Sequence, residues 1–432
     1  MINKNGRIDE MAFIVDADDV LDLSELFQNV KDPEPNMYIA DGQKAAELVS
    51  NLIKNVPGPS SYVIKRIESY IDQLFSLFKD ITLNNELEIY EQFSDLCARL
   101  SERQKNRKLQ DKVVVSFGGK FSAGKSKFIN SISGIGDILP VAQAPTTSIP
   151  TYIIKGKDTN LRANSIYGYS TALSTDSMNA LTHEFYDVYG IGFSAFVDNI
   201  IVEAESFSLP KEIALLDTPG YTKFDDKSNS KMNISDRQKA FDQLRVSDYL
   251  IWLVDIENGG LTKDDISFIE TLRIRTPILI VFTKADLKPE AEIKEIIRGA
   301  QNTIKQTSIN CFGITAYSSN LNMEYGEKII PQFIDNTISS TIRSNNILEE
   351  FNKLEGELRN NIEAALRQSN NTTRGLFSYI TNSKKIMEIR SLAALWGKTN
   401  QECYQLNNLM KRYDTIVSKI NGEVRRYMRQ CD

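Results

Sequence analysis

The sequence is poor in the residues that build metal and redox centres. It has one histidine, His183, and four widely separated cysteines with no C-x-x-C spacing. A single imidazole nearly excludes histidine-based metal ligation and catalytic triads, so we expect His183 to be a surface or packing residue. The cysteine spacing argues against both a disulfide framework and a zinc site, and favours a reducing compartment. We therefore expect a cytoplasmic protein.

Long hydrophobic runs and a strong excess of one charge are also missing. No window of about 18 apolar residues occurs, so the sequence predicts no transmembrane helix, and any membrane contact would be peripheral, at the inner face of a membrane. The N-terminus mixes acidic residues into its short apolar patch and lacks the form of a signal peptide. The formal net charge of −6 over 432 residues gives no general attraction to nucleic acid, and we expect no such partner.

The strongest positive signal is a glycine-rich loop that begins at Gly119. An apolar run over residues 113–117 breaks into the pattern G-x-x-x-x-G-K-S, and a helix-like segment follows. Such a strand, loop and helix bind phosphate, because the glycines let backbone N–H groups turn inward and the helix N-terminus adds a positive dipole end. We expect Lys125 to reach the β- and γ-phosphates and Ser126 to hold Mg²⁺. The nucleotide-binding positions predicted here are Gly119, Lys120, Phe121, Ser122, Ala123, Gly124, Lys125, Ser126 and Lys127.

Two further loops are predicted to sense the γ-phosphate. The first, Asp217-Thr218-Pro219-Gly220, follows an apolar strand as a D-x-x-G loop should. Asp217 is predicted to bind Mg²⁺ through water, and the Gly220 N–H to contact the γ-phosphate. The second covers residues 144–151, where a switch threonine that closes over Mg²⁺ belongs, and Thr147 is our choice for it. An ordinary polar loop is the alternative for this segment.

The base is expected to be guanine. Thr283-Lys284-Ala285-Asp286 closes an apolar strand and fits the pattern [NT]-K-x-D. In this pattern the carboxylate of Asp286 accepts from guanine N1–H and the 2-amino group, and the stem of Lys284 covers the base. Adenine lacks these donors, so an ionised carboxylate rejects it by leaving groups unpaired. A last base-covering loop is expected at residues 317–319, with Ser318 as the contact.

Strand-like and helix-like segments alternate from about 111 to 340, which predicts an α/β P-loop domain with a mostly parallel central sheet. Residues 44–110 and 341–432 have helical periodicity and are predicted to form a neck-like helical bundle, with a turn at Gln368–Arg374. Residues 1–43 are read as an acidic, irregular arm. Strands are expected at 113–117, 200–204, 213–216, 249–254, 278–282 and near 311–315. Helices are expected at 126–133, 177–189, 235–245, 263–273 and 290–308.

These motifs resemble the dynamin superfamily, particularly bacterial dynamin-like proteins. The resemblance rests on the loop over 121–126, the Thr-Thr-x-x-Pro spacing at 146–150, threonine rather than asparagine at Thr283, and Tyr221 after the D-x-x-G motif where Ras-like proteins carry glutamine. It covers about residues 112–320. Elsewhere only the helical character agrees.

The resemblance implies a GTPase that dimerises through its nucleotide face. Ser122 matches the family's P-loop serine and inherits a catalytic role by this resemblance, and the family uses a monovalent cation to offset charge. Lys125 and Thr147, predicted from the motifs themselves, are the other candidate catalytic residues. Phe121 departs from eukaryotic dynamins, which place a glutamine there. Full-length members add a stalk and a membrane-binding tip. The roughly 90 residues after the GTPase domain are too few for both, so the chain is a compact or truncated member, or a larger dynamin-like partner supplies the rest.

Three functions remain open. The first is a GTP-hydrolysing enzyme that dimerises and acts in membrane remodelling or membrane-associated assembly. The second is a GTP-dependent regulatory switch, or a subunit of a hetero-oligomeric complex, with slow turnover. The third is a ribosome-linked GTPase of the Era type, which the acidic balance disfavours. Residues 351–432 carry fourteen Lys and Arg against eight Asp and Glu, which suits either a solvated helix face or an anionic surface as partner.

Overall fold

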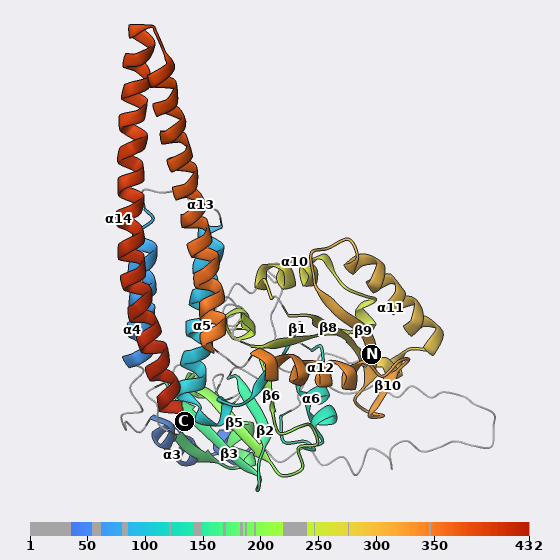
Figure 1. Ribbon diagram of the computed structural model, residues 1–432. Coiled ribbons are helices and arrows are strands. Elements are labelled where there is room, and N and C mark those ends of the chain that lie inside the picture. The colour runs from blue at the N-terminus through green and yellow to red at the C-terminus, as the bar shows by residue number, and fades with distance from the viewer. Residues whose placement is uncertain are drawn as a thin grey trace, which may run out of the picture.

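The computed structural model has an α/β domain joined to a long helical bundle (Figure 1). The residues that it describes are 36–53, 62–79, 85–120, 122–140, 149–166, 170–181, 185, 188–193, 196–218, 240–245, 247–274, 276–344 and 347–431. Several predictions concern residues outside these ranges, namely most of the N-terminal arm, Phe121, Thr147, His183, Gly220 and Tyr221.

A ten-stranded sheet forms the centre of the α/β domain, in the order β10-β9-β8-β7-β1-β6-β2-β5-β3-β4. The neighbours from β9 to β6 all run parallel, while β2 is antiparallel to β6, and β3, β4 and β10 also join antiparallel. The predicted α/β fold with a mostly parallel sheet is therefore confirmed. The strands are β1 (Val113–Gly119), β2 (Thr151–Lys155), β3 (Asn160–Ser165), β4 (Ser170–Leu173), β5 (Val197–Ala204), β6 (Ile213–Asp217), β7 (Tyr249–Asp255), β8 (Ile278–Thr283), β9 (Cys311–Ser318) and β10 (Met323–Tyr325).

Successive side chains of β7 point to opposite faces of the sheet and so contribute to two separate hydrophobic cores. Ile251 and Leu253 face one hydrophobic cluster, which the helices α6 (Lys125–Ser133) and α12 (Ile329–Ser344) complete. Leu250 and Trp252 face a second cluster, which α10 (Lys263–Leu272) and α11 (Glu290–Ile304) complete. Apolar residues on both faces of the strand are typical of a parallel sheet covered by helices on both sides.

Some elements differ from the predictions. The strands β2, β3, β4 and β10 were not predicted; β3 alternates exposed and buried positions, and β10 has three residues, so neither carries a long apolar run. The helix predicted at 177–189 was wrong at its start and in its continuity. α7 spans Thr175–Ala180, because Ser174 and Ser177 form a capping box that starts it two residues earlier, and Leu181 is its C-cap. Of the remaining predicted range, the described residues 185, 188 and 189 are helical. Of the helix predicted at 235–245, the described part, 240–245, is helical.

Four helices form the bundle: α4 (Tyr62–Ser76), α5 (Glu86–Lys105), α13 (Ile347–Asn382) and α14 (Ile386–Cys431). They share one apolar core, to which Leu74, Phe93, Leu358, Tyr413 and Ile420 contribute fully buried side chains. In Figure 1, α13 and α14 continue as a two-helix hairpin well beyond the ends of α4 and α5. None of the described helices is both long and apolar enough to span a bilayer.

The turn predicted at Gln368–Arg374 was wrong, because α13 runs through it and the chain reverses at 383–385. The polar side chains in this run form hydrogen bonds to the backbone of their own helix. Thr372 and Thr373 donate their hydroxyls to the carbonyl oxygens of Gln368 and Ser369, four residues earlier, at 3.0 and 2.9 Å. Because these hydroxyls find hydrogen-bond acceptors within the helix, the helix can continue through a sequence whose composition is typical of a loop.

Residues 44–110 were predicted to belong to the bundle, but the first helix of this segment packs against the sheet. α3 (Gly42–Ile53), which follows the short α2 (Met37–Ala40), packs Ala45, Leu48 and Leu52 into the core of the sheet. Its Asn51 carbonyl accepts from the Thr171 hydroxyl of β4 at 3.0 Å. The antiparallel extension formed by β3 and β4 gives α3 an apolar surface that the sequence did not reveal. The domain limits otherwise stay a prediction.

Candidate functional site

The predicted motif residues that the structure describes meet at one edge of the sheet. β1, β6, β8 and β9 are parallel, so their carboxyl ends point the same way, and each is followed by one of the predicted loops. In open α/β sheets ligands bind at this edge. The site has a phosphate end, at β1 and β6, and a base end, at β8 and β9.

Two glycines fix the phosphate loop. Gly119 has φ +149°, and a Cβ there would lie 2.4 Å from the carbonyl oxygen of Leu253 on the adjacent strand. Gly124, at φ +74°, is the left-handed residue that starts α6. Ser122 also has positive φ, at 64°, and its side chain is exposed at the surface of the loop. The backbone thus turns tightly over the N-terminus of α6, as phosphate binding requires.

Lys125 lies buried beneath the loop. Its Nζ is 3.5 Å from the carbonyl oxygens of Gly119 and Lys120. Burial lowers the pKa of Lys125, and the neighbouring charge of Asp217 acts in the opposite direction. An ammonium group held away from water in this way favours an anion above it, because the anion replaces the lost hydration.

Ser126 and Asp217 form the other half of the phosphate end. The Ser126 hydroxyl donates to Asp217 Oδ2 at 2.7 Å. Asp217 Oδ1 is buried and has no hydrogen-bond partner among the described residues. Burial raises the pKa of Asp217 to about 6, although Lys125 and the Ser126 hydroxyl lower it. A carboxylate oxygen that is buried without a partner is a group that a cation would satisfy.

This oxygen pair fits a divalent metal ion such as Mg²⁺, which prefers oxygen ligands. Within the described ranges, no group of three or more His, Cys, Asp or Glu side chains comes together as a metal cage. Ser126 and Asp217 would therefore hold the ion with phosphate oxygens and water as its other ligands, which is how Mg²⁺ binds beside nucleotides. The third predicted ligand, Thr147, lies outside the described residues.

The base end is organised around Asp286, in the short η4 turn (Ala285–Leu287). Asp286 Oδ1 accepts from the Ser318 hydroxyl at 2.6 Å, and Oδ2 accepts from the Asn320 amide at 2.8 Å. The hydrogen bond from Ser318 is the main reason that the pKa of Asp286 is lowered, so the carboxylate stays ionised. The structure thus brings Asp286 and Ser318 together. Asn320 was not predicted, and its position two residues after Ser318 was the only signal for it.

Thr283 and Lys284 hold the two ends together. The Thr283 hydroxyl donates to the Ala123 carbonyl in the phosphate loop at 2.8 Å. Lys284 Nζ lies 2.6 Å from Asp255 Oδ2. Because Asp255 is the last residue of β7, the side chain of Lys284 extends from the end of β8 to the end of the neighbouring strand. Asp255 was not predicted from the sequence, because its role becomes visible only when β7 and β8 are paired.

Two predicted loop residues direct their side chains away from the phosphate end. Lys120 Nζ lies 2.6 Å from the Thr262 hydroxyl and 3.0 Å from Asp265, at the start of α10. Lys127 contacts Asn320 Oδ1 and so reaches towards the base end. Any contact of Lys120 with phosphate would therefore come from its backbone N–H.

The chain is similar to several known proteins. Residues 114–285 match the sequence model of the Dynamin family. Two solved structures of an oligomerised bacterial dynamin pair match with 14% and 16% identity and a TM-score of 0.40 each; they cover 91% and 79% of this chain. The matches take in 73% of the first of those chains and 53%, about half, of the second. Era bound to MgGDPNP and part of 16S ribosomal RNA matches with 15% identity and a TM-score of 0.32, over 52% of this chain and 56% of its own. None of the curated proteins matches the sequence.

Proposed function

From the premise that this chain is a member of the dynamin superfamily, with a Dynamin-family domain over residues 114–285, we propose that it binds GTP and GDP with Mg²⁺ and hydrolyses GTP. One observation carries the proposal. A buried lysine and a buried carboxylate lie at the phosphate end of the same sheet edge whose base end holds an ionised Asp286. Phosphate and guanine are the two ligand parts that these groups recognise.

The chain's own residues would do the following. Lys125 offsets negative charge on the β- and γ-phosphates, and backbone N–H groups from Gly119 to Ser126 surround them. Mg²⁺, held by Ser126 and Asp217, would neutralise the charge that develops on the phosphate oxygens. Asp286 accepts two hydrogen bonds from guanine while Ser318 and Asn320 fix its orientation.

The catalytic role of Ser122 is proposed from the resemblance to dynamins, and those of Thr147 and of the Gly220 N–H at the γ-phosphate from their sequence motifs. The exposed position of Ser122 at the mouth of the loop suits a group that positions water or a monovalent cation. A difference in turnover between K⁺ and Li⁺ would test the cation.

We also propose that two copies associate through the nucleotide face in the GTP state. Three exposed apolar side chains support this: Leu287 next to Asp286, and Leu321 and Met323 in the turn after Ser318, which are 52%, 59% and 41% exposed. Apolar groups that surround a polar ligand site are typical of an interaction surface. Covering them with a second copy would also exclude water from the nucleotide.

A peripheral role at anionic membranes is supported by the free end of the hairpin. At its apex Ile386 and Met387 are 73% and 77% exposed, next to Lys384 and Lys385. Apolar side chains beside basic ones suit the interface of an anionic bilayer. The alternative, a switch subunit of a larger dynamin-like complex, is supported by the same exposed residues, because a partner chain could cover them.

The test is GTP turnover per molecule across a protein concentration series, with and without anionic liposomes. Lys125→Ala is the control for the site. A specific activity that rises with concentration or lipid and disappears in Lys125→Ala supports the dimerising membrane enzyme. A slow, flat rate with tight GTP binding supports the switch, and no binding of GTP at micromolar concentrations refutes both.

A further inference from the structure

The turn between β9 and β10, residues 319–322, is held from one side by α6. Lys127 and Ser131 lie four residues apart, so they share one face of this helix. Their partners are Asn320 and Asn322, which lie two residues apart in the turn. We call these four residues the α6 bracket and residues 319–322 the base turn. The bracket joins the helix that begins at the phosphate end of the site to the turn at its base end.

The first contact of the bracket is a chain of three polar groups. Lys127 Nζ contacts Asn320 Oδ1, and Asn320 Nδ2 donates to Asp286 Oδ2 at 2.8 Å. An ammonium group only donates and a carboxylate only accepts, so the two charges determine which end of the Asn320 amide faces each of them. Hydrogen bonds to charged groups are stronger than those between neutral groups. Lys127 therefore helps to hold Asn320 in the orientation in which it supports Asp286.

The second contact lies one helical turn further along α6. Asn322 Oδ1 accepts from the Ser131 hydroxyl at 3.0 Å and from the Tyr317 hydroxyl, and these two hydroxyls lie 2.9 Å apart. Asn322 has φ +49°, a left-handed conformation that asparagine tolerates better than most residues. Phe128 of α6 packs against Tyr317, with ring centroids 5.0 Å apart. Hydrogen bonds and an aromatic contact thus fix the base turn against α6.

The shape of the base turn determines how Asp286 is presented. The Ser318 hydroxyl donates to Asp286 Oδ1 at 2.6 Å and accepts from the Leu321 N–H at 3.1 Å. With Asn320 on Oδ2, each carboxylate oxygen accepts from one side chain of this region and has a further lone pair for guanine. The hydrogen bond from Ser318 is the largest cause of the lowered pKa of Asp286, and the charge of Lys127 acts in the same direction. A carboxylate that is already aligned loses less freedom when a base binds, which favours binding.

We propose that Lys127 and Ser131 are positioning residues for the nucleotide base, and that they act on Asp286 through Asn320 and Asn322. Specificity for guanine then depends on α6 as well as on the base turn. The identity of the ligand rests on the proposed function, because the base site is assigned from GTP binding. Lys127 directly follows the phosphate-binding motif in the sequence, yet its side chain acts at the other end of the nucleotide.

A positioning role and a purely structural role predict different losses. Lys127, Asn320 and Asn322 are exposed, and exposed polar contacts contribute little to the stability of a fold. Their removal should therefore leave thermal unfolding nearly unchanged and misalign the carboxylate of Asp286. That carboxylate accepts from guanine N1–H and the 2-amino group, whereas hypoxanthine has the N1–H but lacks the 2-amino group. The preference for GDP over inosine diphosphate (IDP) therefore measures the alignment directly.

The experiment measures the dissociation constants of GDP and IDP by competition with a fluorescent GDP analogue. Lys127→Met and Ser131→Ala remove one contact each from the side of α6. Asn322→Gly removes the second contact from the side of the turn, and glycine keeps the left-handed backbone accessible. Lys127→Arg and Ser131→Thr keep a donor at each position and serve as conservative replacements.

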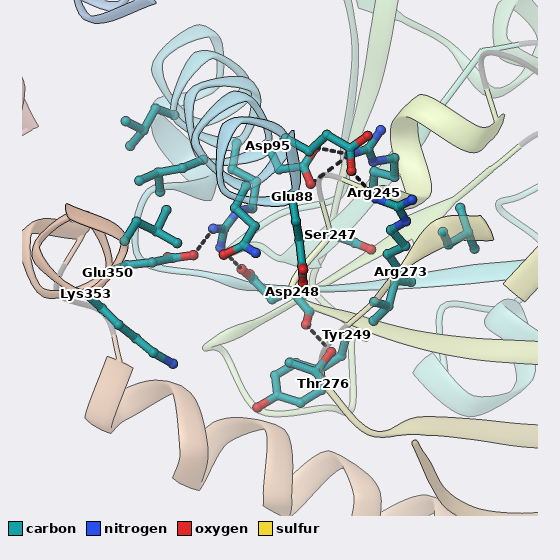
Figure 2. Close-up of a pocket in the computed structure, with 18 of the residues that line it drawn as sticks. Glu88, Asp95, Arg245, Ser247, Asp248, Tyr249, Arg273, Thr276, Glu350 and Lys353 are labelled. Carbon is teal, nitrogen blue, oxygen red and sulfur yellow. Dashed lines mark hydrogen bonds and ion pairs between the residues drawn. The ribbon is translucent and has the colours of Figure 1, made fainter. Parts of the chain in front are cut away.

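Two other lysines control for the loss of a positive charge, which weakens binding of any diphosphate. Lys288 lies two residues after Asp286, and its ammonium pairs with Glu292 of α11 at 2.6 Å. Lys353 of α13 lines a cleft of about 1010 Å³ between the bundle and the amino end of β7, at the opposite edge of the sheet from the nucleotide site (Figure 2). Lys288→Met and Lys353→Met remove the same charge as Lys127→Met and leave the bracket intact.

We expect Lys127→Met, Ser131→Ala and Asn322→Gly each to lower the preference for GDP over IDP by about 2- to 12-fold, the value of one hydrogen bond. Lys127→Arg and Ser131→Thr should retain most of the preference, and the two control variants should retain all of it. Because Ser131 and Asn322 act through one contact, the double variant should lose no more than either single variant.

Three outcomes would contradict this expectation, and they can be told apart. A loss of affinity that is equal for GDP and IDP would mean that the bracket only stabilises the domain, and would overturn the proposal. An unchanged preference in all three variants, with GDP still bound, would also overturn it and would leave the proposed function intact. If the unsubstituted protein binds neither nucleotide, the proposed function itself is wrong and the bracket has no base to position.

Discussion

Replacing Gly119 by alanine gives a stringent test of how the phosphate loop is built. Gly119 is the last residue of β1, and its register partner in β7 is Leu253. A Cβ at position 119 would lie 2.4 Å from the Leu253 carbonyl oxygen. Because this neighbour is backbone, it can give way only by disturbing the pairing of β1 with β7.

The cost has two parts. The φ of +149° is a region that residues other than glycine rarely adopt, at about 1–3 kcal/mol. Overpacking against fixed atoms adds about 1–3 kcal/mol. We therefore expect Gly119→Ala to lower the free energy of unfolding of the GTPase domain by about 2–6 kcal/mol, a large share of the roughly 5–15 kcal/mol typical of a native protein.

Gly136→Ala is the matched control, because Gly136 has φ +69° and a Cβ added there would meet nothing within 4 Å. It should cost only the strain of a left-handed residue, about 1–2 kcal/mol. The assay is urea unfolding followed by the fluorescence of Trp252, which is fully buried in β7, with Trp396→Phe as background. A Gly119→Ala protein no less stable than Gly136→Ala would refute the argument from close approach.

Three other changes test the site and the bundle. Asp286→Asn should weaken GTP binding about 5- to 150-fold, since an unpaired buried donor costs about 1–3 kcal/mol. Competition binding should also show improved binding of xanthosine triphosphate. Unchanged selectivity between the two nucleotides would contradict a role for Asp286 in binding the base. Burial raises the pKa of Asp217 to about 6, so a proton competes with Mg²⁺ below that pH. The Mg²⁺ affinity of the GDP complex, measured by calorimetric titration, should therefore fall as the pH drops from about 7.5 to about 5. An equal pH dependence of the Mg²⁺ affinity in Asp217→Asn would contradict this assignment. Tyr413→Phe removes a hydroxyl that donates to Glu355 in the bundle core, and should cost about 1 kcal/mol in thermal unfolding, with turnover by the GTPase domain intact.

The sequence alone was sufficient to predict the parallel core of the sheet and to place Asp286 near Ser318. Buried parallel strands are continuous apolar runs, and the phosphate loop, the D-x-x-G motif and the two base loops each come at the end of one, so their place at the sheet edge follows from topology alone. Asp255 and Asn320 could not be identified in the same way. Their contacts with Lys284 and Asp286 depend on which loops become neighbours after folding.

Local composition was a poor guide in the C-terminal helices. The Ser, Asn and Thr run at 368–374 has the composition of a turn, yet hydroxyls that donate to carbonyls four residues earlier let α13 continue.

The antiparallel strands β3 and β4 were also hard to predict. β3 alternates buried and exposed residues and β4 is partly exposed, so these short segments do not stand out from loops in the sequence. Tertiary packing, here with α3, decides their conformation.

The length of α14 gives the bundle a mechanical consequence. With 46 residues it is about 69 Å long, and only its lower part is braced by α4 and α5. A tilt of about 10° at the base of such a rod would carry its free end through about 12 Å by simple geometry from that length. A small displacement at the base of the hairpin would therefore become a movement several times larger at its apex.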